Sequence, residues 1–476
     1  MLRSLKTAAV AALLAAAWGA QATPTTTHSY DDPICIVGAG PAGLSAAKTL
    51  EDLGKAVVIF EKQAEVGGKC QAYYEDDKFF PLGAVIFTKE TYVETWKLFD
   101  VTGVPYSNHS FGQIYQFNWT DGTAWIQEDP SDDTVTALMA EYYRYVEIWS
   151  SEFEPLSVVG YKNGVPDELT VSGAAWLEAN SFYYLPSLFI RAMTMYGYGD
   201  YREIPVLYLL NLFTPEILLG GMGVGQSYQA DFHKLFVEYA KTIEGKIHLD
   251  TTIESIDRTS NPKITYRPSS NHGRETQPCS SVIMAFPPLV DALESAGLSL
   301  TEAESTLFSH VSKIDYFASA VRVPRLPGNT SFFSAPVSRV APVVPEGQPV
   351  GFVPLHPGSG IASVWSHDRH ALPSPAAERS RVRSLLVDTM TGYNKPDPAD
   401  ASAAGDQVAP GDIVAWSGDI DYFPHVRSGE ALRAGFYRSL QDMQGANGTY
   451  YVSALSGFEL VEFALRAGRD AGGYFE

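Results

Sequence analysis

Three glycines near the amino-terminal end carry the clearest chemical signal in the sequence. Gly38, Gly40 and Gly43 have the spacing G-x-G-x-x-G, directly after the apolar run 34–37 and directly before an alanine-rich run that favours a helix. In that context the first glycine permits a tight turn, the second lets the backbone approach a pyrophosphate, and the third lets helix and strand pack closely. The N–H groups that begin the helix then face the phosphates. The predicted turn consists of Gly38, Ala39, Gly40, Pro41, Ala42 and Gly43.

A carboxylate follows the glycine turn at the sequence spacing that is typical of dinucleotide-binding sites. Glu61 closes a second apolar run, 56–60. An acid at this point accepts hydrogen bonds from the ribose 2′-OH, which favours an adenosine without a 2′-phosphate. We assign Lys62, the next residue, to the same site. The alternative, a glycine-rich turn with an acid nearby by chance, is disfavoured because strand, helix and Glu61 occur together.

Two further motifs follow, Gly67-Gly68-Lys69-Cys70 and Phe80-Pro81-Leu82-Gly83-Ala84. With them, the stretch 38–84 resembles the FAD-binding region of the flavin amine oxidase superfamily. The resemblance implies that Gly68 and Lys69 wrap the pyrophosphate and that Gly83 and Ala84 run beside the flavin. It also implies that Ile253 offers its backbone to the adenine. A lysine beside a diphosphate is favourable, although it lacks the bidentate fork of the arginine that the superfamily more often has. The resemblance favours FAD over NAD.

The resemblance continues along the rest of the chain. Tyr196-Gly197-Tyr198-Gly199 and the stretches 422–426 and 449–452 are similar to segments of bacterial FAD-dependent polyunsaturated fatty acid isomerases. With the amino-terminal leader described below, the chain also resembles fungal FAD-dependent oxidoreductases of the β-cyclopiazonate dehydrogenase type. That family acts in secondary-metabolite pathways.

One carboxyl-terminal motif departs from the superfamily pattern. Where the superfamily carries Gly-Asp or Gly-Glu after a short strand, this chain has Ser453-Ala454. Ser453 can still donate a hydrogen bond to a phosphate or hydroxyl, but the charge is absent. Phe458 and Glu459 are predicted to begin a helix whose amino-terminal end faces the flavin C2=O and favours the reduced, anionic flavin. The alternative is a helix that only closes the fold.

Four residues are candidates for contact with substrate. The protein's part in flavin chemistry is to supply position, electrostatics and exclusion of water. Tyr196 and Tyr198 lie between glycines in a predicted loop that presents their rings to a pocket, the alternative being ordinary packing. Tyr422 and His425 lie close to the final return to the FAD-binding domain. His425 is a candidate acid or base near neutral pH, the alternative being a structural histidine.

Metal binding and covalent flavin attachment are not expected. His367 and His370 are three residues apart, but no carboxylate or cysteine partner falls at ligand spacing. Cys70, at the second glycine motif, is expected to pack rather than to act as a redox thiol. The carboxyl-terminal region has no cysteine to attach the flavin, so we expect dissociable FAD. The 3 cysteines allow at most one disulfide.

The first residues read as a secretory signal. Arg3 and Lys6 precede the apolar run 7–20, and 20–22 offers small residues for cleavage. The run is too short to span a bilayer comfortably; the alternative is a signal anchor that stays attached. We expect a protein of the secretory pathway, secreted or held in a vacuole or vesicle. Four asparagines are N-glycosylation acceptors by sequence: Asn108, Asn118, Asn329 and Asn447.

The composition excludes several classes of partner. The chain has 476 residues and a net charge of −21, so a nucleic-acid backbone or an anionic lipid surface is not expected to bind it. Hydrophobic residues make up 45%, too many for a disordered protein. No later segment reads as a membrane helix, and the oligomeric state stays open.

The predicted fold is α/β: a Rossmann-like, amine-oxidase-type FAD-binding domain with an interleaved α+β substrate domain and a helical cap. The chain is expected to cross between them several times. The predicted segments are a signal peptide at 1–22, FAD-binding parts at 33–106, 220–288 and 415–476, substrate domain and cap at 107–219, and further substrate domain at 289–414.

Three functions follow from this organisation. The first is an FAD-dependent oxidoreductase that passes a hydride from an apolar small molecule, such as a fungal secondary metabolite, to flavin N5. The second is a redox-neutral double-bond isomerase of a lipid-like substrate, favoured by the tyrosine–glycine segment 196–199 and by 422–425. The third is a flavin-binding protein without turnover, considered because of the missing carboxyl-terminal acid.

Overall fold

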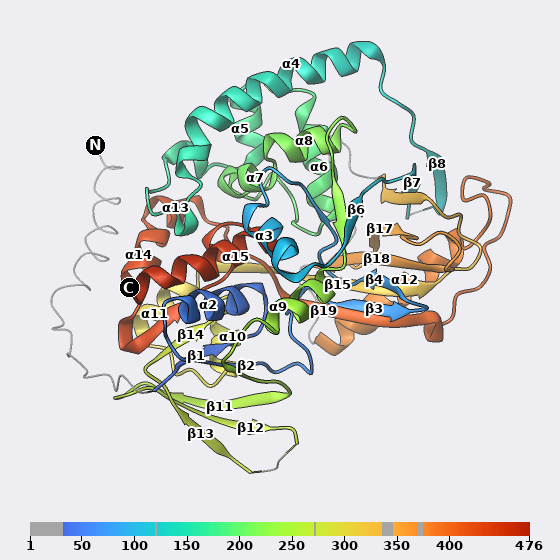
Figure 1. Cartoon of the computed structure of the whole chain (residues 1–476). Helices are drawn as coiled ribbons and strands as arrows, with labels where there is room; N and C mark the ends of the chain where they lie inside the picture. The colour runs from blue at the N-terminus through green and yellow to red at the C-terminus, as the bar shows by residue number, and fades with distance from the viewer. Residues whose placement is uncertain (1–31, 120, 271–272, 336–345, 369–374) are drawn as a thin grey trace.

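The computed structural model describes residues 32–119, 121–270, 273–335, 346–368 and 375–476 (Figure 1). The expected signal peptide, 1–22, lies outside these residues, as does His370. Among the described residues, no helix is both long and apolar enough to cross a membrane.

A parallel sheet forms the centre of the dinucleotide-binding half. Strand β1 (Ile34–Val37) pairs in parallel with β2 (Val57–Phe60) on one side and with β14 (Ser281–Met284) on the other. All three strands are buried along their whole length, which explains their continuous apolar sequences. Within the described chain the sheet has five strands, in the order β10 (Lys246–His248), β2, β1, β14 and β20 (Thr449–Tyr451). The strands of this sheet therefore come from three separate stretches of the chain.

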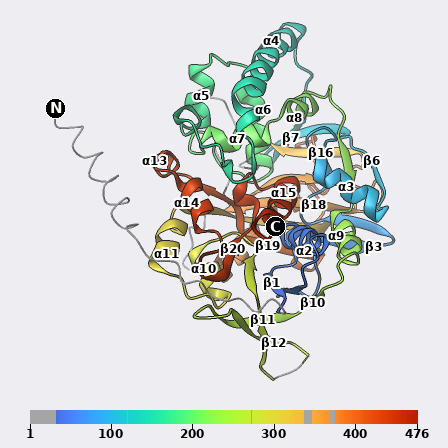
Figure 2. The same cartoon turned by 60° about the vertical axis from the view of Figure 1, so that its left-hand side comes forward.

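Two helices cross closely on this sheet. Helix α2 (Pro41–Asp52) follows the glycine turn, and α15 (Val461–Asp470) lies beside it (Figures 1 and 2). A Cβ atom on Gly468 of α15 would lie 2.4 Å from the Ala42 carbonyl oxygen, so the crossing requires glycine. Ser45 Oγ donates to the Leu465 carbonyl at 2.8 Å and joins the same helices.

A second, seven-stranded sheet in the described chain lies on the right in Figure 1, in the region predicted to be the substrate domain. Its strands, in order, are β19 (Ile413–Val426), β15 (Val311–Arg322), β18 (Ile361–Asp368), β17 (Pro349–Val353), β16 (Thr330–Ser334), β7 (Gln113–Asn118) and β8 (Thr123–Ile126). Because β19 pairs with β15 as far as Val426, the predicted boundary at 415 is wrong, and the last FAD-binding segment begins after this strand.

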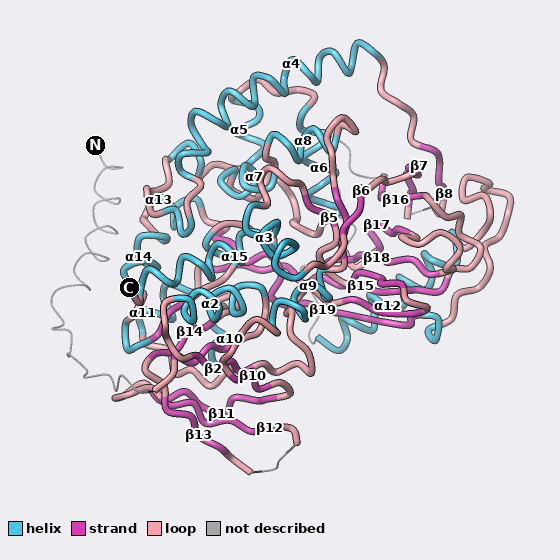
Figure 3. The backbone as a smooth tube through the Cα atoms, viewed as in Figure 1, coloured by secondary structure: helices cyan, strands magenta, loops and turns pink. Residues whose placement is uncertain are grey.

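A helical cap lies at the top of the view in Figure 1, and the backbone tube of Figure 3 separates its helices from the strands. Buried hydrogen bonds hold it together: Tyr145 Oη donates to the Phe213 carbonyl at 2.5 Å, and Trp149 Nε1 donates to the Leu210 carbonyl at 2.8 Å. The cap consists of α4 (Asp132–Ile148), α5 (Gly173–Ala179), α6 (Leu185–Met195), α7 (Val206–Leu212) and α8 (Pro215–Gly221).

The remaining elements connect these units. Short strands form two small sheets, β3 (Ala72–Glu75) with β4 (Lys78–Pro81), and β9 (Tyr228–Ala230) between β5 (Ile86–Phe87) and β6 (Tyr106–Asn108). An antiparallel meander joins β11 (Thr251–Asp257), β12 (Lys263–Pro268) and β13 (Glu275–Pro278). The other helices are α3 (Val93–Thr102), α9 (Phe232–Ala240), α10 (Val290–Ser295), α11 (Glu302–Phe308), α12 (Pro375–Tyr393), α13 (Gly429–Arg433) and α14 (Phe436–Met443).

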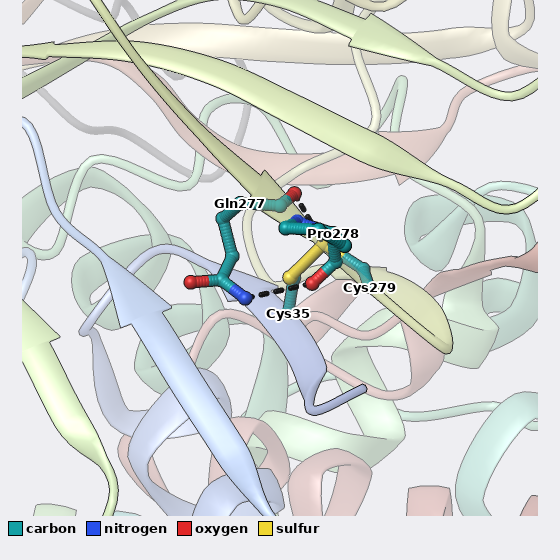
Figure 4. The surroundings of a disulfide bond; sticks show 4 residues. All are labelled: Cys35, Gln277, Pro278 and Cys279. Carbon is teal, nitrogen blue, oxygen red and sulfur yellow. Dashed lines mark hydrogen bonds between the residues drawn. A yellow bond between two sulfur atoms is a disulfide. The ribbon is translucent and has the colours of Figure 1, made fainter. Parts of the chain in front are cut away.

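A disulfide joins Cys35 of β1 to Cys279, which precedes the neighbouring strand β14 (Figure 4). The two Cα atoms are 5.7 Å apart, and both residues are fully buried. This bridge agrees with the limit of one disulfide drawn from the cysteine count. The third cysteine, Cys70, is buried and lies outside the bridge.

Candidate active site

Two glycine turns meet at the carboxyl end of the parallel sheet. Gly38 has a φ of +106°, and a Cβ atom on Gly43 would lie 2.0 Å from the Gly38 carbonyl oxygen. Gly67 N–H donates to the Ala39 carbonyl at 2.9 Å, and a Cβ atom on Gly68 would come within 3.0 Å of the Gly40 Cα. The two motifs, more than 20 residues apart in sequence, thus form one cradle whose surfaces are bare backbone.

Helix α2 points its amino-terminal end into this cradle. It begins with Pro41, and its cap residue, Gly40, has no side chain that could cap the first N–H groups. The N–H groups of Ala42 and Gly43 have no acceptor within the helix, as in the first turn of any α-helix. With the helix dipole they form a site for an anion such as a phosphate.

Glu61 joins the first glycine turn to the end of β2. The side chain is buried; Oε2 accepts the Ala39 N–H at 2.7 Å, and Oε1 accepts the Gln63 N–H at 2.8 Å. Each carboxylate oxygen keeps further lone pairs for a ligand hydroxyl. Lys62 is exposed to solvent, so the structure does not bring its side chain into the buried cradle.

The segment with Gly83 and Ala84 packs on the second glycine turn. A Cβ atom on Gly83 would lie 1.9 Å from the Lys69 carbonyl oxygen, and Leu82 N–H donates to the Gln71 carbonyl at 2.8 Å. Only glycine permits this contact. The predicted proximity of the two motifs is therefore present in the structure.

Two further predicted residues lie at the same edge. Thr251 N–H donates to the Glu61 carbonyl at 2.9 Å, and Ile253 follows two residues later on β11. Ser453 comes directly after β20 and its neighbour Val452, where it is buried and its Oγ accepts the Leu455 N–H at 3.3 Å. The bond from Thr251 to Glu61 places Ile253, and the position of β20 in the sheet places Ser453, on the side of the sheet that carries the glycine turns.

This cradle fits a dinucleotide. Close backbone approaches at Gly40 and Gly68, a helix end without a side-chain cap and a buried carboxylate at Glu61 match the needs of a pyrophosphate and a ribose. The residues that would hold FAD are those glycines, the first-turn amides of α2 and Glu61. Ser453 offers the cofactor a neutral hydrogen-bond donor at the position where the superfamily pattern has an acid.

The Lys69 ammonium is engaged by two carboxylates. It lies 3.0 Å from Glu459 Oε1 and 3.3 Å from Asp421 Oδ1, and it donates to the Asp421 carbonyl oxygen at 2.9 Å. It also lies 5.6 Å from the centre of the Tyr422 ring. Lys69 therefore forms ion pairs with the carboxyl-terminal segment, and its contact with a diphosphate stays a prediction.

A wall of tyrosine rings stands beside this ion pair. Tyr422 lies between Tyr198, at 5.5 Å between ring centres, and Tyr316, at 4.4 Å, and both pairs are nearly parallel. Tyr422 Oη donates to the Tyr196 carbonyl at 2.9 Å. Gly197 allows this arrangement because a Cβ atom there would lie 2.6 Å from the Tyr316 ring. The structure thus brings the predicted tyrosines 196, 198 and 422 together.

Tyr316 was not among the predicted site residues. It lies on β15 and is buried. Nothing in the local sequence distinguishes it from other buried strand residues, because its position depends on the pairing of β15 with β19.

Phe458 is fully buried and contacts the tyrosine wall. Its ring centre lies 4.7 Å from that of Tyr198, whose hydroxyl donates to the Glu459 carbonyl at 3.1 Å. The helix predicted to begin at Phe458 begins instead at Val461, with Leu460 as its cap residue. Phe458 and Glu459 therefore lie in the connection before the helix.

His425 lies in the core and not in the tyrosine wall. Its side chain stacks on Phe423 at 4.3 Å between ring centres, Nδ1 lies 2.8 Å from the Phe423 carbonyl oxygen, and the residue is 2% exposed. Burial lowers the pKa of His425 from 6.5 to about 4. It is therefore neutral near pH 7, and the structure gives it the structural role that the sequence left as an alternative.

No cluster of three or more potential metal ligands occurs among the residues that the structure describes. His367 is buried on β18, whereas its proposed neighbour His370 is outside the described ranges. Cys70 is buried next to the second glycine turn and donates its N–H to the Gly67 carbonyl at 2.9 Å.

Comparison with known proteins identifies the family. The model of the flavin-containing amine oxidoreductases matches residues 41–322, more than half of the chain. This chain belongs to that family. The oxidoreductase is 26% identical over 456 residues to the FAD-dependent oxidoreductase dpasF of Apiospora sacchari, covering 88% of each chain. It is 23% identical over 427 residues to the beta-cyclopiazonate dehydrogenase of Aspergillus flavus, again covering 88% of each.

Solved structures share the fold of this oxidoreductase. The CLA-producing fatty acid isomerase from P. acnes superposes with a TM-score of 0.76 at 21% identity, covering 94% of this chain and 99% of that one. Putrescine oxidase superposes with a TM-score of 0.59 at 16% identity, covering 93% and 98%. The oxidoreductase is thus an FAD-dependent enzyme with the amine-oxidase-type fold.

Proposed function

We propose that this enzyme dehydrogenates a largely apolar small molecule of the kind made in fungal secondary metabolism. The observation that carries the proposal is the stack of Tyr198, Tyr422 and Tyr316 beside the second glycine turn. Tyr198 and Tyr316 are buried, and Tyr422 between them is partly exposed. An aromatic surface of this kind favours contact with a flat, apolar ligand, because such a ligand loses no hydrogen bonds to water there.

The tyrosine hydroxyls are already used within the protein. Tyr422 Oη donates to the Tyr196 carbonyl, and Tyr198 Oη donates to the Glu459 carbonyl. Burial raises the pKa of Tyr198 and that of Tyr422 well above their usual value, so both stay neutral. The wall therefore orients a substrate by ring contact rather than by charge.

FAD, when bound, supplies the hydride acceptor at its N5 atom. The protein's own part is to hold the substrate against that position and to exclude water. Relatives named as FAD-dependent oxidoreductases and dehydrogenases, aligned over nearly the full chain, support net oxidation.

A redox-neutral isomerase is the second candidate. In favour of it, the fatty acid isomerase superposes better, with a TM-score of 0.76 against 0.59 for putrescine oxidase. In such a reaction the hydride returns to the substrate at another carbon, and a double bond moves.

Anaerobic mixing of the holoenzyme with candidate lipids, polycyclic metabolites and amines distinguishes the two candidates. We expect persistent bleaching of the flavin absorbance with a polycyclic apolar substrate. Double-bond migration without net bleaching supports the isomerase instead. A flavin spectrum that no class of candidate changes overturns both, and bleaching by simple amines alone overturns the apolar substrate class.

We further propose that the protein matures in the secretory pathway. The buried Cys35–Cys279 disulfide supports this, because structural disulfides persist in oxidising compartments. Asn108, Asn329 and Asn447 are exposed and accessible to a glycan. Peptide mapping of the protein from its native host after endoglycosidase treatment tests the proposal. Unmodified asparagines together with a retained signal sequence would contradict it.

A further inference from the structure

Glu459 and Asp421 share the single ammonium of Lys69. Lys69 Nζ lies 3.0 Å from Glu459 Oε1 and 3.3 Å from Asp421 Oδ1. With both carboxylates ionised, the cluster carries one net negative charge. In a partly buried site this excess charge raises the proton affinity of the cluster, which suits a group that starts the reaction as a carboxylate and takes up one proton during it.

Glu459 is the carboxylate better placed to take that proton. Its side chain is 12% exposed, against 28% for Asp421. Its Oε2 atom is buried and has no hydrogen-bond partner among the described residues, whereas Oε1 is held by Lys69. Burial raises the pKa of Glu459 above its usual value, and the Asp421 carboxylate raises it further, against the opposing effects of the Lys69 ammonium and of the Phe423 backbone N–H.

The groups around Glu459 place it between the cofactor cradle and the tyrosine wall. Lys69 belongs to the second glycine turn, and its carbonyl oxygen is the atom on which Gly83 packs. On the other side, Phe458 packs on Tyr198, whose hydroxyl donates to the Glu459 carbonyl. The titratable and charged groups that face the carboxyl are therefore Lys69, Asp421, Tyr198 and Tyr422. Lys69 is the single cation in that set.

We propose that Glu459 is the proton acceptor of the dehydrogenation, an inference that rests on the function proposed above. In that reaction a substrate C–H bond and a neighbouring C–H, N–H or O–H bond break while a double bond forms. The hydride, with its two electrons, passes to FAD, which is the oxidant. The proton passes to Glu459 Oε2, and the carboxylate becomes a carboxylic acid that keeps the proton until FAD is reoxidised and then releases it to solvent. Because Lys69 binds Oε1, Oε2 is the carboxylate oxygen left to accept the proton.

The test needs no substrate, because the proposal requires Glu459 to be protonated when FAD is reduced. The midpoint potential of bound FAD is measured against pH around neutrality in the wild type, Glu459→Gln and Asp421→Asn. We expect the wild type to take up one more proton for every two electrons than Glu459→Gln, which gives a steeper dependence on pH. Asp421→Asn, which removes the other carboxylate from the same ammonium, is the matched control and is expected to keep the extra proton.

Equal slopes in the wild type and Glu459→Gln overturn the proposal, as does loss of the extra proton in Asp421→Asn alone. If Glu459→Gln does not retain FAD, infrared difference spectra of the wild-type holoenzyme decide. A carboxylic acid C=O band that appears on reduction supports the proposal, and its absence overturns it. Failure here with substrate-dependent bleaching intact refutes the role of Glu459 and leaves the proposed dehydrogenation standing.

Discussion

Gly40 and Gly68 face each other across the two glycine turns, so closely that a Cβ atom on Gly68 would come within 3.0 Å of the Gly40 Cα. The Gly67 N–H bond to the Ala39 carbonyl fixes this approach. The contact joins the two motifs into one binding surface. It also explains why each motif has a glycine at the point of contact, since a side chain there would crowd the facing backbone.

Gly40→Val is expected to purify without FAD. The Cβ position already lies 3.6 Å from the Gly68 Cα, so the valine methyl groups must push the turns apart or occupy the space of the phosphates. The absorbance of the purified protein measures the FAD content. Gly221→Val is the matched control, because a Cβ there meets no described atom within 4 Å. A yellow Gly40→Val protein would contradict this placement of the pyrophosphate.

Glu61→Gln is expected to weaken FAD binding by about tenfold to a hundredfold. The Glu61 carboxylate accepts hydrogen bonds from two backbone N–H groups, those of Ala39 and Gln63. The glutamine amide has only one acceptor oxygen, so one of these buried N–H groups would face the NH₂ group and lose its hydrogen bond, at a cost of about 1–3 kcal/mol. Fluorescence titration of the apoprotein with FAD measures the affinity. Lys62→Ala is expected to bind FAD as the wild type does, since that side chain is exposed. The opposite ranking of these two variants would show that Lys62, and not Glu61, contacts the cofactor.

Tyr422→Ala is expected to lower kcat/KM by about tenfold to a hundredfold, because it removes the central ring of the stack with Tyr198 and Tyr316. Tyr422→Phe keeps the ring and loses only the bond to the Tyr196 carbonyl, so its loss is expected to be smaller. Steady-state kinetics with a substrate found by anaerobic mixing compares the two variants. Equal losses would mean that the hydroxyl, and not the ring face, is what the substrate requires.

His425 is expected to make the folded state less stable in acid. Its pKa falls from 6.5 to about 4 on folding, so the unfolded chain binds the proton more readily between these values, and stability decreases as the pH falls through that window. The contribution amounts to about 3 kcal/mol at pH 4. We expect urea unfolding as a function of pH to show that His425→Gln loses less free energy of unfolding than the wild type as the pH falls to 4, by that amount. Parallel pH profiles of the two proteins would refute the assignment.

Removing the Cys35–Cys279 bridge is expected to lower the free energy of unfolding by about 2–4 kcal/mol, because the bridge constrains the unfolded chain across a separation of 244 residues. Urea unfolding of Cys35→Ala/Cys279→Ala, with and without a thiol reductant, measures the loss. The reductant is expected to bring the wild type to the level of the double variant and to leave that variant unchanged. Wild-type stability that does not respond to full reduction would count against the bridge.

The turn at Gly38–Gly43 could be predicted from sequence because its strand, turn and helix are contiguous and each glycine has a local steric reason. The resemblance of 38–84 to a known family likewise indicates FAD from the sequence alone. The tertiary structure alone decided the pairing of Lys69 with Glu459, which are 390 residues apart, and the stacking of Tyr316 on Tyr422.

The same distinction explains the wrong predictions. The sequence predicts that the segment from 415 to Val426 belongs to the FAD-binding domain, but its strand pairs with β15, and strand pairing between distant segments leaves no local pattern. His425 looked like a possible acid or base because burial is not visible in a single residue type, whereas in the fold it lies against Phe423 in the core. The steric requirements of the cofactor turn involve only a few consecutive residues, so the sequence by itself determined that turn. Contacts between distant segments depend on how the whole chain packs. Only the tertiary structure therefore decided the tyrosine wall and the ion pair beside it.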